Sequence, residues 1–150
     1  MGILNDLLGR VKTFNEGLTG GTYIAELIER NDWLILSWNA DDQLYDKGIT
    51  ATGVSIWDYA PYSPVTIEIK QEEGQPYDRV TLRDTGAFHH SFFLKIDNEK
   101  FEFDAEDWKT RDLLRLYGEE IMGLTDENIQ RLEEEILLPE LMKTAVKTLF

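Results

Sequence analysis

The segment 80–96 constrains the fold of this chain more than any other stretch. It begins with a β-favouring run, turns at Gly86, and continues into Phe92–Ile96, the most aromatic strand candidate in the sequence. Glycine has no Cβ and fits a tight turn, and Asp84 or Thr85 can bond to nearby backbone N–H groups there. We therefore interpret the segment as a junction that sets how a helical layer meets a β-sheet.

Two apolar runs on either side of a short turn predict a β-hairpin. Phe92–Ile96 and Lys100–Phe103 flank the segment 97–99, Asp-Asn-Glu, whose residues favour turns. Alternate residues of a strand point to the same face of a sheet. We expect one face of this hairpin to point toward the core, with the side chains of Leu94, Ile96, Phe101 and Phe103.

Apolar residues recur every three or four positions from Thr22 to Lys47, which predicts one long helix. Thr22 is a suitable N-cap, and Gly48 is placed to end the helix in a left-handed conformation. The run Trp33–Leu36 has the composition of a strand, but its flanks keep the helical spacing, so we favour the helix. Its acidic side chains are expected to face solvent: Glu26, Glu29, Asp41 and Asp42.

The middle of the chain leaves one choice open. Segment 49–62 is predicted to be an irregular, aromatic loop. Ser63 followed by proline is typical of a helix start, which would give a short helix through Lys70. The alternation of apolar residues instead favours a strand, and these residues are Val65, Ile67 and Ile69.

The C-terminal third is predicted to be mostly helical. A helix over 107–117 is followed by Gly118, and Thr125 is placed to cap a final helix. Pro139 is expected to kink or break that final helix, because proline lacks the N–H that a helix interior needs. The predicted fold class is α+β, with long N-terminal helices packed on a small antiparallel sheet and a C-terminal helix.

The length of the chain predicts a single domain, residues 1–150. Residues 1–17 carry an apolar helical face and form an N-terminal helical arm, which glycines separate from an α+β body at 22–150. The arm either docks on a neighbouring subunit or folds onto its own core.

Composition limits the partners of the chain. Its net charge of −14 argues against binding nucleic-acid phosphates or anionic lipid, although an acidic wall can line a channel and repel the DNA inside. The absence of cysteine excludes disulfides, thiolate zinc sites and cysteine nucleophiles. No apolar run approaches the roughly 20 residues of a membrane span, and residues 1–6 lack a basic signal-peptide start, so we expect a soluble cytoplasmic protein.

The residues that carry reactive groups form no convincing active site. The tetrapeptide at 84–87, Asp-Thr-Gly-Ala, matches the active site of retroviral-type aspartic proteases, where two aspartates share a proton. However, Arg83 precedes Asp84 where that family buries an apolar residue, and the glycine-rich flap is absent. Adjacent His89 and His90 diverge in either a helix or a strand, which disfavours a metal site. We predict no catalytic, cofactor-binding or metal-binding residues and no enzymatic activity.

Several motifs together resemble a known family. In order along the chain they are Gln43-Leu44-Tyr45 with Gly48, Tyr62-Ser63-Pro64 with Thr66 and Lys70, Leu82–Phe88 with Ser91, and Ile121–Glu127. This order is similar to that of the virion-morphogenesis proteins of tailed bacteriophages, which are small neck and tail-completion proteins. Their recurrent core, Leu-x-x-Thr-Gly-x-hydrophobic-x-x-Ser, is satisfied by Leu82, Thr85, Gly86, Phe88 and Ser91. The chain departs from the family at 113–118, where a His-Gln-x-Gly passage is common and L-L-R-L-Y-G stands here.

The resemblance implies a structural role in the virion: copies of the chain join as a ring, a homo-oligomer that connects head and tail. Its implied partners are itself and other phage head, neck or tail proteins, with no specific nucleic-acid binding, no membrane and no cofactor. Its implied location is the virion, and the host bacterial cytoplasm during assembly. The hairpin 92–103 and the helix 22–47 would form the rigid body, while loop 49–62 and the terminal helices contact neighbours. The alternatives are a non-viral protein–protein interaction module and an aspartic protease that uses Asp84.

Overall fold

The structure is a computed structural model that describes residues 23–97 and 100–149. The predicted arm at 1–17 and the proposed cap Thr22 lie outside the described residues. The described chain is mixed α+β, with helices around one two-stranded antiparallel sheet and a helix at its C-terminal end. None of the helices in this part of the chain is long and apolar enough to cross a membrane.

A nearly continuous helical rod runs through the middle of the molecule. It consists of α2 (Tyr23–Arg30), α3 (Asp32–Ser37) and the π-helical stretch η1 (Trp38–Lys47). Gly48 ends the rod at φ +64° and donates its N–H to the Leu44 carbonyl, which confirms the predicted left-handed cap.

The helical prediction for Trp33–Leu36 is also confirmed, because these residues lie in α3. The solvent-facing prediction is right for the three exposed side chains of Glu26, Glu29 and Asp41. Asp42 differs, because its side chain is half-buried. It lies 3.6 Å from the ammonium of Lys47 and accepts a hydrogen bond from Asn128.

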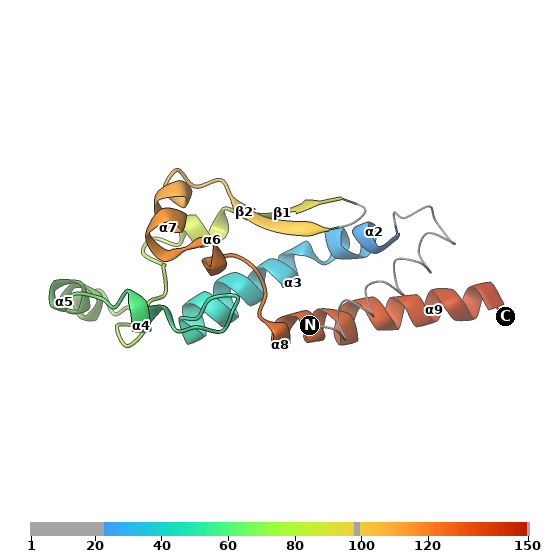
Figure 1. The fold of residues 1–150 in the computed structure, drawn as a ribbon, viewed down its shortest axis with the longest axis horizontal. Helices are drawn as coiled ribbons and strands as arrows, with labels where there is room; N and C mark the ends of the chain where they lie inside the picture. Colours follow the sequence, from blue (N-terminus) through green and yellow to red (C-terminus); the bar gives the residue numbers. More distant parts are fainter. Residues whose placement is uncertain (1–22, 98–99, 150) are drawn as a thin grey trace.

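The predicted hairpin is present and covers one side of the rod (Figure 1). Strands β1 (Phe92–Ile96) and β2 (Phe101–Ala105) pair antiparallel, with Leu94 opposite Phe103. The four side chains expected to face the core do pack against it, and they are Leu94, Ile96, Phe101 and Phe103. The alternation of the two strands therefore places their apolar face on the helices.

The C-terminal helices cover another side of the rod, so that the rod lies between them and the hairpin (Figure 1). This layer is one long helix made of α8 (Asp126–Leu132), the π-helical turn η3 (Glu133–Leu137) and α9 (Leu138–Leu149). The Thr125 hydroxyl caps it by accepting the Asn128 N–H at 3.2 Å, as predicted. The core between the layers is built from Leu27, Ile28, Ile35, Trp38, Leu124, Leu132, Ile136, Leu137 and Leu141.

Of the two outcomes expected at Pro139, a kink or a break, the break does not occur. The helix continues through this proline, which follows directly on the π-helical turn η3. In an α-helix a proline ring crowds the carbonyl four residues earlier and leaves it without a donor. The wider winding of a π-turn relieves this conflict.

Helix α7 (Thr110–Tyr117) begins three residues later than predicted. The three residues before it form a turn, in which the Asp107 carboxylate accepts the Lys109 N–H and the Asp107 carbonyl accepts the Thr110 N–H. Gly118 ends the helix at φ +95° and leads into the 3-10 turn η2 (Glu119–Ile121).

The two helices α4 (Ile56–Tyr59) and α5 (Pro64–Glu72) form a lobe at one end of the elongated molecule (Figure 1). Helix α5 settles the open choice for 63–70 in favour of a helix. The Ser63 hydroxyl accepts the Thr66 N–H at 3.1 Å, which is the capping that a serine before a proline predicts.

The junction 80–96 contains helix α6 (Ala87–His90) and β1, but its β-favouring start forms no strand. Thr81 donates its N–H to the Tyr62 hydroxyl, and Arg83 donates its N–H to the Thr81 hydroxyl. These two backbone N–H groups donate to side-chain hydroxyls, so they are not free to pair with a neighbouring strand. Val80 and Phe88 are buried in a second core cluster with Ala40, Leu44, Ile56, Phe92 and Ile121.

Candidate functional site

The best-defined polar arrangement in the described chain is a set of three buried amide side chains, which we name the amide clamp. Its members are Asn39 and Gln43 on η1 and Asn128 on α8. Asn39 and Gln43 are four residues apart, so they share one face of the helix. That face points at the connector 118–125, which links α7 to α8.

Two amides of the clamp, those of Asn39 and Gln43, bind backbone groups of the connector. Asn39 donates to the Ile121 carbonyl at 3.0 Å and accepts the Gly123 N–H at 3.1 Å. Gln43 donates to the Gly123 carbonyl at 2.8 Å and accepts the Thr125 N–H at 3.0 Å. The Asn128 amide completes the set by donating to Gln43 Oε1 at 2.7 Å. The clamp therefore satisfies an irregular buried backbone, which would otherwise be costly to remove from water.

A second joint fixes the lobe and the segment 79–83 to the end of the rod. Arg79 donates from Nε to the Tyr45 carbonyl at 2.7 Å, and the Arg83 guanidinium lies 4.8 Å from the Tyr45 ring centroid. Gly48 lies so close to this segment that a Cβ there would be 3.0 Å from the Arg79 Cβ. The buried Lys70 ammonium donates to the Arg83 carbonyl at 2.8 Å, which ties α5 to the same segment.

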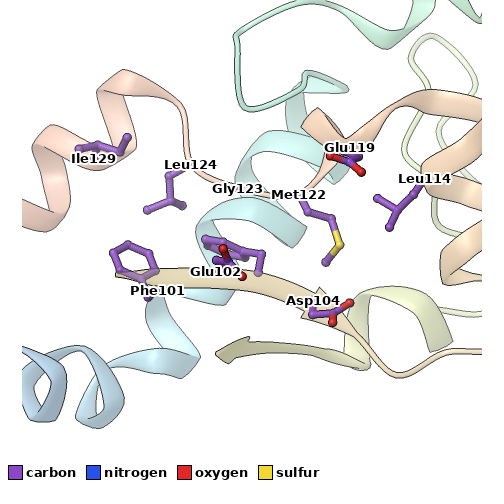
Figure 2. A pocket seen from close by; sticks show the side chains of 10 residues that line it. Phe101, Glu102, Asp104, Leu114, Glu119, Met122, Gly123, Leu124 and Ile129 are labelled. Carbon is purple, nitrogen blue, oxygen red and sulfur yellow. The ribbon is translucent and has the colours of Figure 1, made fainter. Parts of the chain in front are cut away.

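A groove of about 570 Å³ lies between β2, α7 and the connector. Figure 2 shows Met122 reaching from the connector toward β2, with Leu124 and Phe101 further along the same groove. Its apolar lining consists of Phe101, Phe103, Leu114, Met122, Leu124 and Ile129. Three carboxylates also line it, and they belong to Glu102, Asp104 and Glu119. A mostly apolar lining with a few polar groups is found both in small-molecule pockets and in protein contact surfaces.

The carboxylates of the groove do not form a reactive or metal-binding group. Asp104 pairs with the Lys95 ammonium at 2.7 Å, and that hydrogen bond lowers the pKa of Asp104 and raises the pKa of Lys95. No cluster of three His, Asp or Glu residues in the described ranges is arranged to hold a metal ion. Among the described residues, the carboxylates of the groove therefore offer no metal-binding cluster.

The two histidines of the junction diverge, as the sequence indicated. His90 is exposed, whereas His89 is buried with its ring centroid 5.9 Å from that of Phe88 and 5.7 Å from that of Phe92. Burial, and to a lesser extent the charge of Arg83, lowers the pKa of the His89 imidazole to about 4. The backbone of Thr81 and Leu82 near the ring offsets part of this lowering, although neither ring nitrogen meets strict hydrogen-bond geometry with a described residue. The lowered pKa means that the buried imidazole is neutral at pH 7.

Asp84 is exposed on the loop before α6. Its backbone carbonyl accepts a hydrogen bond from the Gln75 side chain at 3.2 Å. The catalytic aspartates of a protease dyad share one proton at close range. An exposed loop position offers none of the enclosure that holds such a pair together.

Asn39 and Asn128 had no predicted role, and Gln43 was predicted only as part of a motif. The available signal was a pair of amides four residues apart on a helix that is otherwise apolar, because buried amides need partners. Comparison with family models, curated proteins and solved structures found no match for this chain. Function is therefore inferred from the motifs in the sequence and from the contacts among their residues in the fold.

Proposed function

We propose that this protein is a structural component of a tailed-bacteriophage virion, a subunit of the ring that joins head and tail. The observation that carries this proposal is that the four stretches which resemble virion-morphogenesis proteins contact one another in the fold. The first and last of them are separated by most of the body of the chain, and the fold brings them together.

The first and last stretches meet through the amide clamp. Gln43 belongs to the first stretch, and its side chain binds the backbone of Gly123 and Thr125 in the last stretch. Thr125 also supplies the cap of α8. The motif residues thus hold the rod, the connector and the C-terminal helix together.

The second and third stretches meet next to the same rod. Tyr62 accepts the Thr81 N–H at 3.0 Å, directly before the third stretch, and Lys70 donates to the Arg83 carbonyl within it. Gly48 packs against the Arg79–Val80 backbone that leads into this stretch. Motif residues that pack together in this way support the resemblance, because a family conserves the contacts of its fold.

We assign no catalytic role to the chain. The exposed position of Asp84 favours a structural role over the protease alternative. The net charge of −14 suits a ring whose inner wall must not hold the DNA that passes through it. The ring would consist of copies of this chain and would contact other head, neck or tail proteins.

Quantitative mass spectrometry of density-purified particles from the source culture tests this proposal. We expect the protein at a low, fixed ratio to the major capsid protein that does not change between gradient fractions. An abundant lysate protein with no virion role serves as the control for contamination. Absence from particles, with free protein abundant in the lysate, would overturn the proposal.

A further inference from the structure

Helix α5 presents an acidic and apolar face that nothing in the described chain covers. Val65 is 65% exposed and Ile69 is 48% exposed, and both lie on this face one turn apart. Glu68 and Glu72 are exposed beside them. The spacing of three and four residues puts all four side chains on one side of the helix, which we name the acidic face.

The opposite side of α5 is the one that attaches to the body. Lys70 is buried there, and its ammonium binds the Arg83 carbonyl and Gln75 Oε1, each at 2.8 Å. It also lies 5.4 Å from the centroid of the Tyr62 ring. These contacts fix the rotation of α5, so the acidic face is held pointing away from its own chain.

Helix α7 presents a basic and apolar face of the same kind. Trp108 is 82% exposed and Leu116 is 71% exposed, which makes them the most exposed of the large apolar side chains described. Trp108 lies in the turn directly before α7, whereas exposed Arg111 and Arg115 are four residues apart on the helix itself. Asp112 pairs with Arg115 at 3.6 Å. We name these residues, 108, 111, 112, 115 and 116, the basic face. Trp and Arg together are the residue types that most often dominate the energy of protein interfaces.

We propose that the acidic face of α5 in one copy docks on the basic face of α7 in a second copy. Two glutamates on one face oppose two arginines on the other, and each face carries two apolar side chains to bury. Both faces are exposed, so they do not cover each other within one chain. The interface deepens the proposed function, on which it rests, because it supplies the contact from which a ring is built.

The two faces differ from each other, and this decides the kind of assembly. An interface between unlike surfaces is heterologous, so each added copy leaves one free acidic face and one free basic face. Such contacts produce a closed ring when the rotation between copies closes. Complementary charge also selects the register of the contact and speeds encounter between copies.

Charge reversal tests the interface on the full-length chain. One variant carries Glu68→Lys and Glu72→Lys, and the other carries Arg111→Glu and Arg115→Glu. Each variant alone faces like charges, so we expect its self-association to weaken roughly 100-fold relative to the wild type. Mixing the two variants restores opposite charges at every contact. Native mass spectrometry of the mixture should then show assemblies in which the two variants alternate.

A second pair of variants tests the apolar part of the interface. Trp108→Ala should weaken self-association about tenfold or more, because a central tryptophan is the typical hot spot of an interface. Trp33→Ala is the matched control, since Trp33 is 67% exposed on α3 and belongs to neither face. Sedimentation velocity over a dilution series measures both, and circular dichroism confirms that each variant is folded.

The outcomes separate the interface from the proposed function. A wild type that stays monomeric over the whole series, or assemblies that the charge reversals leave unchanged, would overturn the interface. A mixture of folded charge-reversal variants that fails to assemble would overturn it as well. The presence of the protein in purified particles is measured independently, so the virion proposal can survive when the interface fails.

Discussion

The amide clamp and the pocket of His89 both remove polar side chains from water, but they treat those side chains in opposite ways. Asn39, Gln43 and Asn128 are buried with hydrogen bonds to the connector and to each other. His89 is buried against two phenylalanine rings, and neither of its ring nitrogens has a good partner among the described residues. The same degree of burial therefore has two different energetic consequences.

The clamp amides stabilise the fold through their hydrogen bonds, whereas His89 is buried without comparable bonds. A satisfied buried amide costs little while it is intact, but removing one partner leaves several groups without hydrogen bonds. A buried neutral imidazole without good partners costs some stability at every pH, and the cost grows at low pH, where the unfolded chain takes up a proton that the folded chain does not. The clamp should hence be sensitive to mutation, and the His89 pocket should be sensitive to pH.

The largest effect is expected from Gln43→Met, which keeps the volume of the side chain and removes its hydrogen bonds. The Gly123 carbonyl, the Thr125 N–H and the Asn128 amide would each lose a buried partner. We expect the free energy of unfolding to fall by about 3 kcal/mol or more. Urea denaturation followed by tryptophan fluorescence measures this change.

The control for this prediction is Gln71→Met, because Gln71 is an exposed glutamine on α5. Its free energy of unfolding should stay within about 0.5 kcal/mol of the wild type, as for most surface changes. Equal losses from the two substitutions would show that the clamp contributes no more than a surface residue.

An intermediate effect is expected from pH, through His89. Burial lowers its pKa in the folded protein to about 4, below the ordinary value of 6.5 that applies to the unfolded chain. Below pH 6.5 the unfolded chain binds a proton that the folded protein does not, so stability falls as pH drops toward 4. From pH 7 to pH 5 this contributes a loss of about 2 kcal/mol.

His89→Leu should remove this part of the pH dependence, and stability curves at several pH values measure the difference from the wild type. The exposed neighbour His90 supplies the control, because His90→Leu should keep most of the loss between pH 7 and pH 5. A His89→Leu protein with an unchanged pH profile would contradict a buried, neutral imidazole.

The smallest and most local effect is expected from Lys70→Met in the lobe. Lys70 is buried like the clamp residues, but its two hydrogen bonds attach only α5. We expect a loss of about 2 kcal/mol confined to the opening of the lobe. Hydrogen exchange should therefore quicken over 64–72 and stay unchanged in α8. Lys147→Met, at an exposed lysine on α9, is the control that should alter neither region.

Much of the fold could be predicted because its signals are local. The helix ending at Gly48, the caps Ser63 and Thr125, and the hairpin face each depend on residues within a few positions of one another. The predictions that failed depend on distant or cooperative contacts. The β-favouring run at 80–83 forms no strand because Tyr62 takes the N–H of Thr81, and Pro139 is accommodated by a change of helical winding.

The candidate sites were harder to predict for the same reason. The sequence predicted no reactive cluster and did not reveal the clamp, because the clamp pairs η1 with backbone groups about eighty residues away. The groove likewise draws its lining from β2, α7 and the connector. The acidic and basic faces are visible in the sequence as spacings, yet only the structure shows which side of each helix is already occupied.

The length of chain that the clamp spans also has a consequence for synthesis on the ribosome. Asn39 leaves the ribosome first, and the Ile121 carbonyl that it binds follows 82 residues later. At about 5–20 residues per second, the rod waits roughly 4 to 16 seconds before its partner exists. During that interval the apolar faces of the nascent rod and hairpin have only each other to cover them. The clamp is thus completed only after the connector has been made, and a nascent chain cut before Gly123 would release a rod whose buried amides lack their backbone partners.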